Sequence, residues 1–213
     1  MYYILENRTD KEVGNVYPQA SCITQNLAHA IEFDEFANFE SPILFELAPK
    51  AKLTDILSQA AISAHGFLLN QKVKDILSGF NLMPHRYYKC IVRDSKGINH
   101  DYYWLHISDY SVLEKINYPD SKFHLRESGF REKDIELSSY EDYEKQKKSL
   151  GILYTIQADK IVFKEDFNSL LDLFVIPIFT NKIAGSNTVK EGILSHKITG
   201  ILMKEYPVFL EKG

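Results

Sequence analysis

The 213-residue sequence predicts an α+β fold in which antiparallel-rich sheets are combined with short helices. Three observations support this prediction: a helix–turn–strand pattern that occurs twice, a central pair of aromatic-rich segments typical of a β-hairpin, and an ordinary globular composition, 45% hydrophobic and 25% charged. No linker rich in Pro, Gly or Ser separates two halves. We therefore expect a single domain over residues 1–213, built from two related helix–strand lobes, with a subdivision near residues 128–150 as the alternative.

The repeated pattern lies at residues 70–83 and again at 187–203. In the first copy Asn70 is placed to cap a helix and Gly79 to end it in the left-handed conformation. Apolar residues follow with the i, i+3, i+4, i+7 spacing of one helix face: Val73, Ile76, Leu77 and Phe80. In the second copy Thr188 and Glu191 have the spacing of a capping box.

The clearest β-structure is predicted at residues 87–93 and 101–107, which flank the turn-prone segment 94–97. Because side chains alternate along a strand, one face of the second arm is predicted to carry Tyr102, Trp104 and His106, and the other Tyr103, Leu105 and Ile107.

The remaining elements are predicted from shorter patterns. We expect strands at 2–5, 43–47 and 173–179, a broken strand pair over 116–125, a hairpin formed by 152–156 and 160–163, and a helix at about 140–149. The segment 23–39 is predicted to be partly helical, with one side of a short helix formed by Phe33, Phe36 and Phe39.

The bulk properties exclude several classes of function. A formal net charge of −4 and a pI near 6.0 give no basic footprint for nucleic acid. Cys22 and Cys90 are far apart in the sequence and are typical of a reducing compartment. The first residues do not resemble a secretion signal, and the longest apolar stretch, 170–179, is about half of what a membrane-spanning helix needs. We expect a cytoplasmic protein that contacts neither nucleic acid nor membrane.

From its motifs, the sequence predicts no catalytic residue, no metal site and no cofactor. The sequence holds no glycine-rich phosphate loop, Gly-x-Ser-x-Gly elbow, His-Glu-x-x-His or Cys-x-x-Cys. His100 and His106 share a predicted strand face, but six strand residues separate them by about 20 Å, too far for one ion. Catalytic triads also assemble from residues distant in sequence, so an enzyme stays the main alternative.

Candidate partner-binding residues lie in the charged segment that follows residue 130. Its carboxylates are Glu132, Asp134, Glu136, Glu141, Asp142 and Glu144. They predict either an acidic surface that steers a basic protein partner or a solvated face, since Lys and Arg are interleaved with them. Tyrosine and tryptophan are favoured contact residues. The candidates are therefore Tyr140, Glu141, Asp142, Tyr143, Glu144 and Trp104, although the strand pattern favours the core for Trp104.

An ordered set of elements resembles a bacterial immunity-protein family of polymorphic toxin systems, formerly catalogued as a domain of unknown function. The resemblance covers residues 50–206, outside the segment 128–159. The matching segments are 53–57, 66–69 leading into the helix at 73–77, the Pro84 entry to strand 87–92, the return strand 101–106, the strand-and-turn element 116–123, and the closing helix 189–194 with the Thr-Gly strand 198–202. This chain departs from the family in having Asn117 where an acidic residue is expected.

The resemblance implies a protein that binds a cognate toxin and covers or plugs its active site without catalysis. It implies no catalytic residues. Two other functions stay open at this point: a small enzyme with a site between the two lobes, using His85, His106 or Asp120, and a regulatory protein-binding module. The sequence leaves the oligomeric state open.

Overall fold

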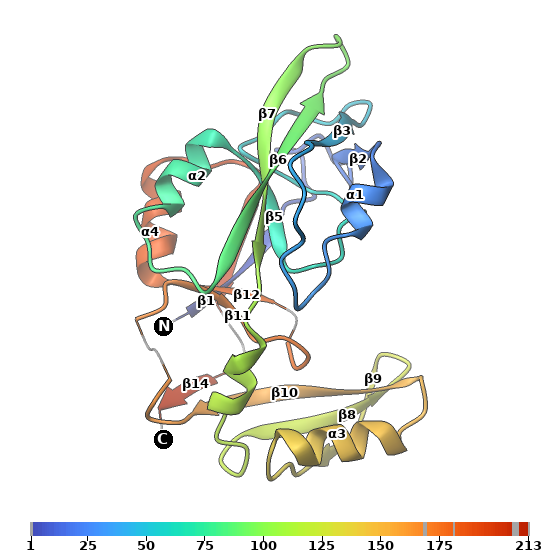
Figure 1. Cartoon of the computed structure of the whole chain (residues 1–213). Coiled ribbons are helices and arrows are strands. Elements are labelled where there is room, and N and C mark those ends of the chain that lie inside the picture. The colour runs from blue at the N-terminus through green and yellow to red at the C-terminus, as the bar shows by residue number, and fades with distance from the viewer. Residues whose placement is uncertain (1, 168–169, 181, 206–208, 213) are drawn as a thin grey trace.

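The computed structural model describes residues 2–167, 170–180, 182–205 and 209–212 of the chain, and these form three sheets (Figure 1). The first sheet has the strand order β2-β3-β6-β7-β5-β4, the second β11-β12-β1-β13, and the third β14-β10-β8-β9. Strand residues (38%) outnumber helical residues (18%), and the pairing is mostly antiparallel, which confirms the predicted α+β class.

The strands and helices have the following bounds. The strands are β1 (Tyr2–Asn7), β2 (Ala20–Cys22), β3 (Ile43–Leu47), β4 (Ile56–Leu57), β5 (Gly66–Asn70), β6 (His85–Arg93), β7 (Asn99–Ile107), β8 (Lys122–Glu127), β9 (Phe130–Ile135), β10 (Tyr154–Phe163), β11 (Leu173–Val175), β12 (Ile183–Ser186), β13 (Ile201–Glu205) and β14 (Phe209–Lys212). The helices are α1 (Gln25–His29), α2 (Gln71–Leu77), α3 (Tyr140–Ser149), α4 (Asn187–Ser195) and the 3-10 helix η1 (Tyr110–Lys115).

The repeat seen in the sequence is also a repeat of topology. In the first lobe, β5 and β6 are both antiparallel to β7, so α2 connects two parallel strands that have β7 between them. In the second lobe, β12 and β13 are both antiparallel to β1, and α4 makes the same connection around β1. Each lobe also has a short strand on the outer side, β4 against β5 and β11 against β12.

The central strand of the second lobe comes from the N-terminus of the chain, whereas its other strands come from the C-terminal part. The pairing register aligns Tyr2 with Tyr102, since Ser186 lies opposite the first and Asn70 opposite the second. This alignment superposes the sequence Tyr-Tyr-Ile-Leu of residues 2–5 on Tyr-Tyr-Trp-Leu of residues 102–105. The two central strands therefore share sequence as well as position.

Both repeated helices begin directly at the end of a strand. The side chain of Asn70 accepts a hydrogen bond from the backbone N of Val73, as predicted, and Ser186 does the same for Val189 in the second lobe. The predicted capping box is wrong, because the helix starts before Thr188. The predicted left-handed Gly79 is also wrong: the residue after the helix is Ser78 in the right-handed conformation, and Gly79 is absent from the positive-φ residues.

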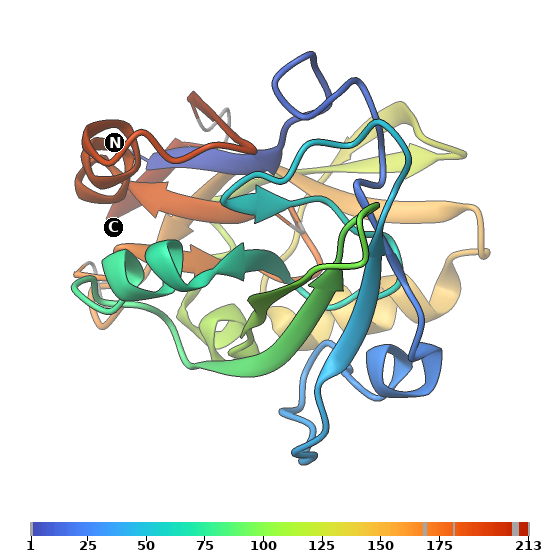
Figure 2. The same ribbon diagram turned by 90° about the horizontal axis from the view of Figure 1, so that it is seen from above.

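Helices α2 and α4 lie side by side (Figures 1 and 2), and a glycine permits their close approach. A Cβ atom added to Gly192 of α4 would lie 2.7 Å from the ring of Phe80, which follows α2. This contact is possible only because residue 192 has no side chain. A Cβ atom at that position would lie closer to the ring carbon than Cβ atoms do in proteins.

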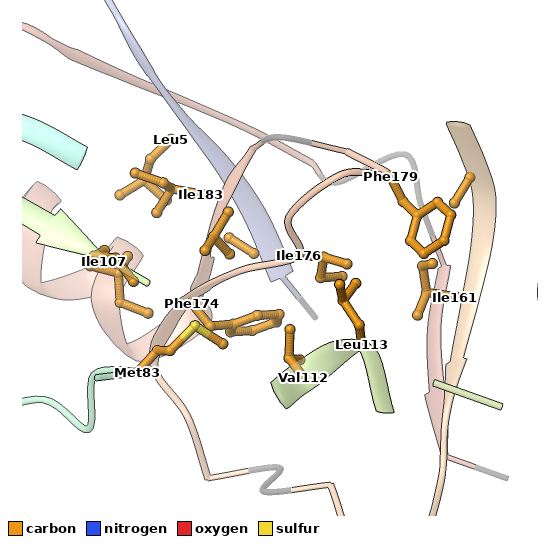
Figure 3. Close-up of a cluster of buried hydrophobic side chains, with 14 of the residues drawn as sticks. Leu5, Met83, Ile107, Val112, Leu113, Ile161, Phe174, Ile176, Phe179 and Ile183 are labelled. Atoms are coloured by element: carbon orange, nitrogen blue, oxygen red, sulfur yellow. The ribbon is translucent and has the colours of Figure 1, made fainter. Parts of the chain in front are cut away.

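The two faces of β7 line two different cores, as its alternation predicts. Tyr102 and Trp104 pack in a cluster with β3 and β6, while Leu105 and Ile107 belong to a larger cluster that contacts all three sheets. Figure 3 shows part of the larger cluster, in which residues from distant parts of the chain converge: Leu5, Met83, Ile107, Val112, Phe174 and Ile183. Burial of such side chains is the main stabilising contribution to the fold.

The third sheet is formed mainly by residues 122–163, and α3 lies along one of its faces (Figure 1). The helix was predicted at 140–149 and is confirmed with those bounds. The hairpin predicted within 152–163 is wrong: β10 is one strand, with a register shift between Ala158 and Lys160. The polar sequence at this irregularity has the composition of a turn.

Three other expectations also differ from the structure. The broken strand pair over 116–125 is replaced by η1, a turn and β8, and the strand over 173–179 is limited to β11. The aromatics of 31–42 do not share a helix, because α1 ends at His29. Phe36 instead packs its ring edge-to-face against His106, at 5.0 Å between centroids, and Phe39 stacks on Tyr88. These aromatic contacts hold an irregular segment across the first sheet.

Candidate partner-binding surface

Two adjoining depressions lie where the third sheet meets the start of α3. The larger has a volume of about 1080 Å³ and the smaller about 520 Å³. Tyr118, Pro119 and Ser138 line both, so the two depressions meet at the turn before β8 and at the residues before α3. We call the two depressions together the acidic groove, because carboxylates predominate among their charged side chains.

Carboxylates outnumber cations in the larger depression. It is lined by five acidic side chains and two basic ones, Asp120, Asp134, Glu136, Asp142 and Asp159 against Lys122 and Arg131, a formal excess of three negative charges. The smaller depression adds Glu114, Glu141 and Lys164. The groove thus attracts cationic groups on a partner and repels anionic surfaces.

Arg131 is engaged within the surface itself. Its guanidinium donates to Asp134 at 2.6 Å and to Asp159 at 2.8 Å. His124 Nδ1 lies 3.1 Å from the same Asp159 carboxylate. These hydrogen bonds raise the pKa of Arg131 and lower that of Asp159, so both groups keep their charges. The network fixes the wall of the groove that β9 and β10 provide.

The start of α3 holds another carboxylate in place. Ser139 caps the helix by accepting from the backbone N of Asp142, and Asp142 in turn accepts from the backbone N and Oγ of Ser138, at 2.9 and 3.1 Å. The hydrogen bond from the Ser138 backbone lowers the pKa of Asp142. A carboxylate in the first turn of a helix is also stabilised by the helix dipole.

The candidate tyrosines differ in exposure. Tyr140 lines the smaller depression and stacks on Tyr143, with 5.8 Å between ring centroids. Tyr143 is only 9% exposed and packs edge-to-face on Phe179. Burial raises the pKa of Tyr143 to about 12. Tyr143 was predicted as a contact residue, but its side chain is buried against Phe179 and is closed to a partner. Tyr140 is half-buried and is the one of the two that lines a depression.

The other candidates divide in the same way. Glu141 lines the smaller depression and Asp142 the larger, while Glu144 is exposed on α3 but does not line either. Trp104 is 3% exposed in the core of the first lobe, which confirms the core position that the strand pattern favours and closes this side chain to a partner.

Two carboxylates of the larger depression, Asp120 and Asp159, lie outside the acidic cluster that the sequence indicates, whereas Asp134 and Glu136 belong to it. Asp120 comes from the turn before β8, and Asp159 from the irregularity in β10. Only the pairing of β8 with both β9 and β10 brings these residues together. No local sequence signal marks such a pairing.

The residues proposed for an enzyme do not meet in this groove. His106 is completely buried beneath Phe36 and stacks near Tyr88, and His85 is exposed on β6 with its Nδ1 3.0 Å from the carbonyl oxygen of Met83. Asp120 lines the larger depression without either histidine.

Exposed apolar side chains gather at one end of the third sheet. Phe130 begins β9, and Ile152 and Leu153 precede β10; their exposed fractions are 77%, 96% and 59%. The backbone N of Ser128 donates to the carbonyl oxygen of Leu153 at 2.9 Å, which ties the turn before β9 to the start of β10. We call Phe130, Ile152 and Leu153 the apolar tip.

Comparison with known proteins gives no relative on which to base a function: the sequence matches no protein-family model and no curated protein. Within the described parts of the chain, no helix is long and apolar enough to cross a membrane.

Proposed function

We propose that this chain is an immunity protein that binds a cognate bacterial toxin inside the producing cell and covers or plugs its active site without catalysis. The observation that carries the proposal is the acidic groove. Three of its carboxylates are held in place, Asp134 and Asp159 by hydrogen bonds from Arg131 and Asp142 by Ser138 before the capped start of α3. Fixed charges capture an oppositely charged protein quickly and orient it without first having to be ordered.

The toxin expected for this groove presents a basic surface around its active site. Enzymes that act on nucleic acids have this character, since they bind phosphates through Lys and Arg. A protein that places carboxylates over such a site competes with the substrate for the same cations. The ordered resemblance over residues 50–206, outside the segment 128–159, supports the same class of function.

A co-expression experiment tests the proposal. The toxin candidate encoded beside this gene is induced in a heterologous bacterium with and without this protein, and the protein carries an affinity tag for purification. We expect restored growth and a complex that survives purification. Continued killing despite good expression of this protein, with no complex formed by any neighbouring toxin candidate, would overturn the proposal.

A charge-reversal variant provides the control for this experiment. Asp120→Lys with Glu136→Lys reverses two groove carboxylates, while Glu46→Lys with Asp101→Lys reverses two exposed charges on β3 and β7, outside the groove. Rescue is expected to weaken for the first variant and to persist for the second.

A further inference from the structure

We infer that the apolar tip is the anchor of the complex, and that it inserts into an apolar concavity of the same toxin whose basic rim contacts the acidic groove. This inference rests on the proposed function and deepens it by naming the contact surface. Three features of the molecule support it: exposed apolar side chains at one end of the third sheet, a hydrogen-bonded turn that carries them, and the negative charge of the acidic groove along the same strand.

The clustering distinguishes the tip from ordinary surface residues. Single exposed apolar side chains are normal on proteins, whereas several at one place mark sites of interaction. Glu127 of β8 lies opposite both Tyr154 and Phe130, so the strand ends that carry the tip residues lie at one end of the sheet. Phe130 and Ile152 are among the most exposed large apolar side chains of the described chain, at 77% and 96%, and both lie at the same end of the third sheet. Burying them in a partner removes more apolar area from water than burying half-covered residues does.

The tip is held by its backbone before any partner arrives. Ser128 and Gly129 have φ values of 48° and 90°, the two successive positive angles of the tight turn that best fits a hairpin. The guanidinium of Arg126 donates to the carbonyl oxygen of Gly129 and, at 2.9 Å, to Gln157 on β10. A fixed anchor loses little conformational entropy on binding, which favours affinity.

Strand β9 joins the tip to the groove. Phe130 is its first residue, and Arg131, Asp134 and Ile135 line the larger depression. β9 is an edge strand, but four consecutive charged side chains, residues 131–134, oppose the addition of a further strand. A partner that covers both the apolar tip and the acidic groove therefore contacts the side chains of β9. One end of this strand is apolar and the other is acidic.

This arrangement of charge favours a heterologous, basic protein over other occupants. A symmetric dimer formed through this face would bring two surfaces of net negative charge together, and like charges would repel. An anionic lipid surface would be repelled in the same way, which opposes membrane insertion of the tip. A toxin with a basic rim around an apolar pocket complements both ends of the face.

The test compares two double variants that remove similar exposed apolar groups. Phe130→Ser with Ile152→Ser alters the tip, and Ile98→Ser with Leu194→Ser alters residues that are 53% and 64% exposed elsewhere. Binding of the purified wild-type protein and of both variants to the neighbouring toxin is measured by calorimetry, after equal melting temperatures confirm that both variants are folded. We expect the tip variant to bind at least about 30-fold more weakly, mainly through faster dissociation, and the control within about threefold.

The outcomes separate this inference from the proposed function. If the wild-type protein binds the toxin and the tip variant binds equally well, the tip is not the anchor, although the immunity function stands. If the wild-type protein binds no neighbouring toxin, both proposals fall. Light scattering of the protein alone at high concentration gives a third outcome: a dimer that the tip variant abolishes would overturn the assignment of the tip to a toxin.

Discussion

Asp55 in the first lobe accepts two hydrogen bonds from Thr199 in the second lobe, from the backbone N and from Oγ1, each 2.8 Å long. The opposite relationship also exists: Asp172, which precedes β11 as Asp55 precedes β4, accepts from the backbone N of Asn81 at 3.0 Å. Each aspartate thus holds the turn that follows the repeated helix of the other lobe. The lobes are joined by a reciprocal pair of contacts that repeats along with the fold.

Removing the Asp55 carboxylate is expected to destabilise the protein. Asp55→Ala leaves the donors of Thr199 and Asn70 without their acceptor, and the loss of hydrogen bonds to a partly buried charged group lowers the free energy of unfolding by about 2–4 kcal/mol. Urea unfolding at pH 7 measures this change. Asp101→Ala, at an exposed surface carboxylate, is the control and should change stability by less than about 0.5 kcal/mol.

The Asp55 carboxylate should also make the folding stability depend on pH in the acid range. Burial acts to raise the pKa of Asp55, but hydrogen bonds from Thr199 and Asn70 outweigh it and hold the pKa below its ordinary value of 3.8. The stabilisation is therefore present above that value and is lost as the pH falls through the lower folded-state pKa. The difference in stability between the wild-type protein and Asp55→Ala should be constant from pH 5 to 7 and shrink below about pH 4. A difference that grows in acid would contradict this assignment.

His65 is expected to limit stability at mildly acid pH. It is 8% exposed, its Nε2 atom has no hydrogen-bond partner, and burial, with a contribution from neighbouring His106, lowers its pKa from 6.5 to about 4. The unfolded chain then binds a proton that the folded chain does not. The contribution of His65 should lower the free energy of unfolding by about 3 kcal/mol as the pH falls from 6.5 to 4. Below pH 4 this contribution should stay constant.

Urea unfolding at several pH values isolates the contribution of His65. His65→Leu should remove this part of the pH dependence, while His29→Gln, at an exposed site, should leave it unchanged. Parallel pH profiles for the wild-type protein and His65→Leu would show that His65 does not limit stability in acid.

Two glycine substitutions separate backbone strain from a steric clash. Gly97 and Gly200 both have positive φ, 79° and 86°, but a Cβ at Gly97 meets only the far end of Arg93, whereas a Cβ at Gly200 would lie 1.9 Å from the carbonyl oxygen of Ile56. Gly97→Ala is expected to cost about 1 kcal/mol of stability and Gly200→Ala at least about 3 kcal/mol. Chemical unfolding measures both losses of stability. If the two variants lose the same free energy of unfolding, the backbone at Gly200 is farther from Ile56 than in the structure.

Salt dependence tests the role of the acidic groove in capturing a toxin. Asp120→Lys with Glu136→Lys should lower the association rate about tenfold at low ionic strength, and the loss should shrink as salt screens the charges. Stopped-flow mixing with the neighbouring toxin measures the rate. Glu46→Lys with Asp101→Lys changes the net charge by the same amount outside the groove and is the matched control; a similar effect of this variant would assign the steering to net charge alone.

The sequence predicted those parts of the fold whose signals are local. The central hairpin, α3 and the cap at Asn70 follow from alternation, helix signals and a side chain with a clear preference, and all three are confirmed. The repeat was recognised only from its helix–strand segments. The repeat also includes the match of residues 2–5 with residues 102–105. These segments are distant in the sequence, and only the pairing register aligns them.

The errors have physical causes of the same kind. Within β10 the polar residues at the register shift have turn composition, yet pairing with β8 on one side and β14 on the other keeps the chain extended. The candidate surface was predicted in part, through Tyr140, Glu141 and Asp142. Tyr143 was misplaced because its environment is set by Phe179, a residue far away in the sequence.

The measurement that tests the central claim most directly is a titration of toxin activity with the purified protein. A fixed concentration of the neighbouring toxin, well above the dissociation constant, is mixed with increasing amounts of this protein, and the activity is measured after short and long incubation. Neutralisation by binding predicts that activity falls linearly, ends at one equivalent, and does not change with time once the complex has formed. Complete inactivation by a small fraction of an equivalent, progressing with time, would contradict the account, because only a catalyst that modifies the toxin or its substrate acts in that way.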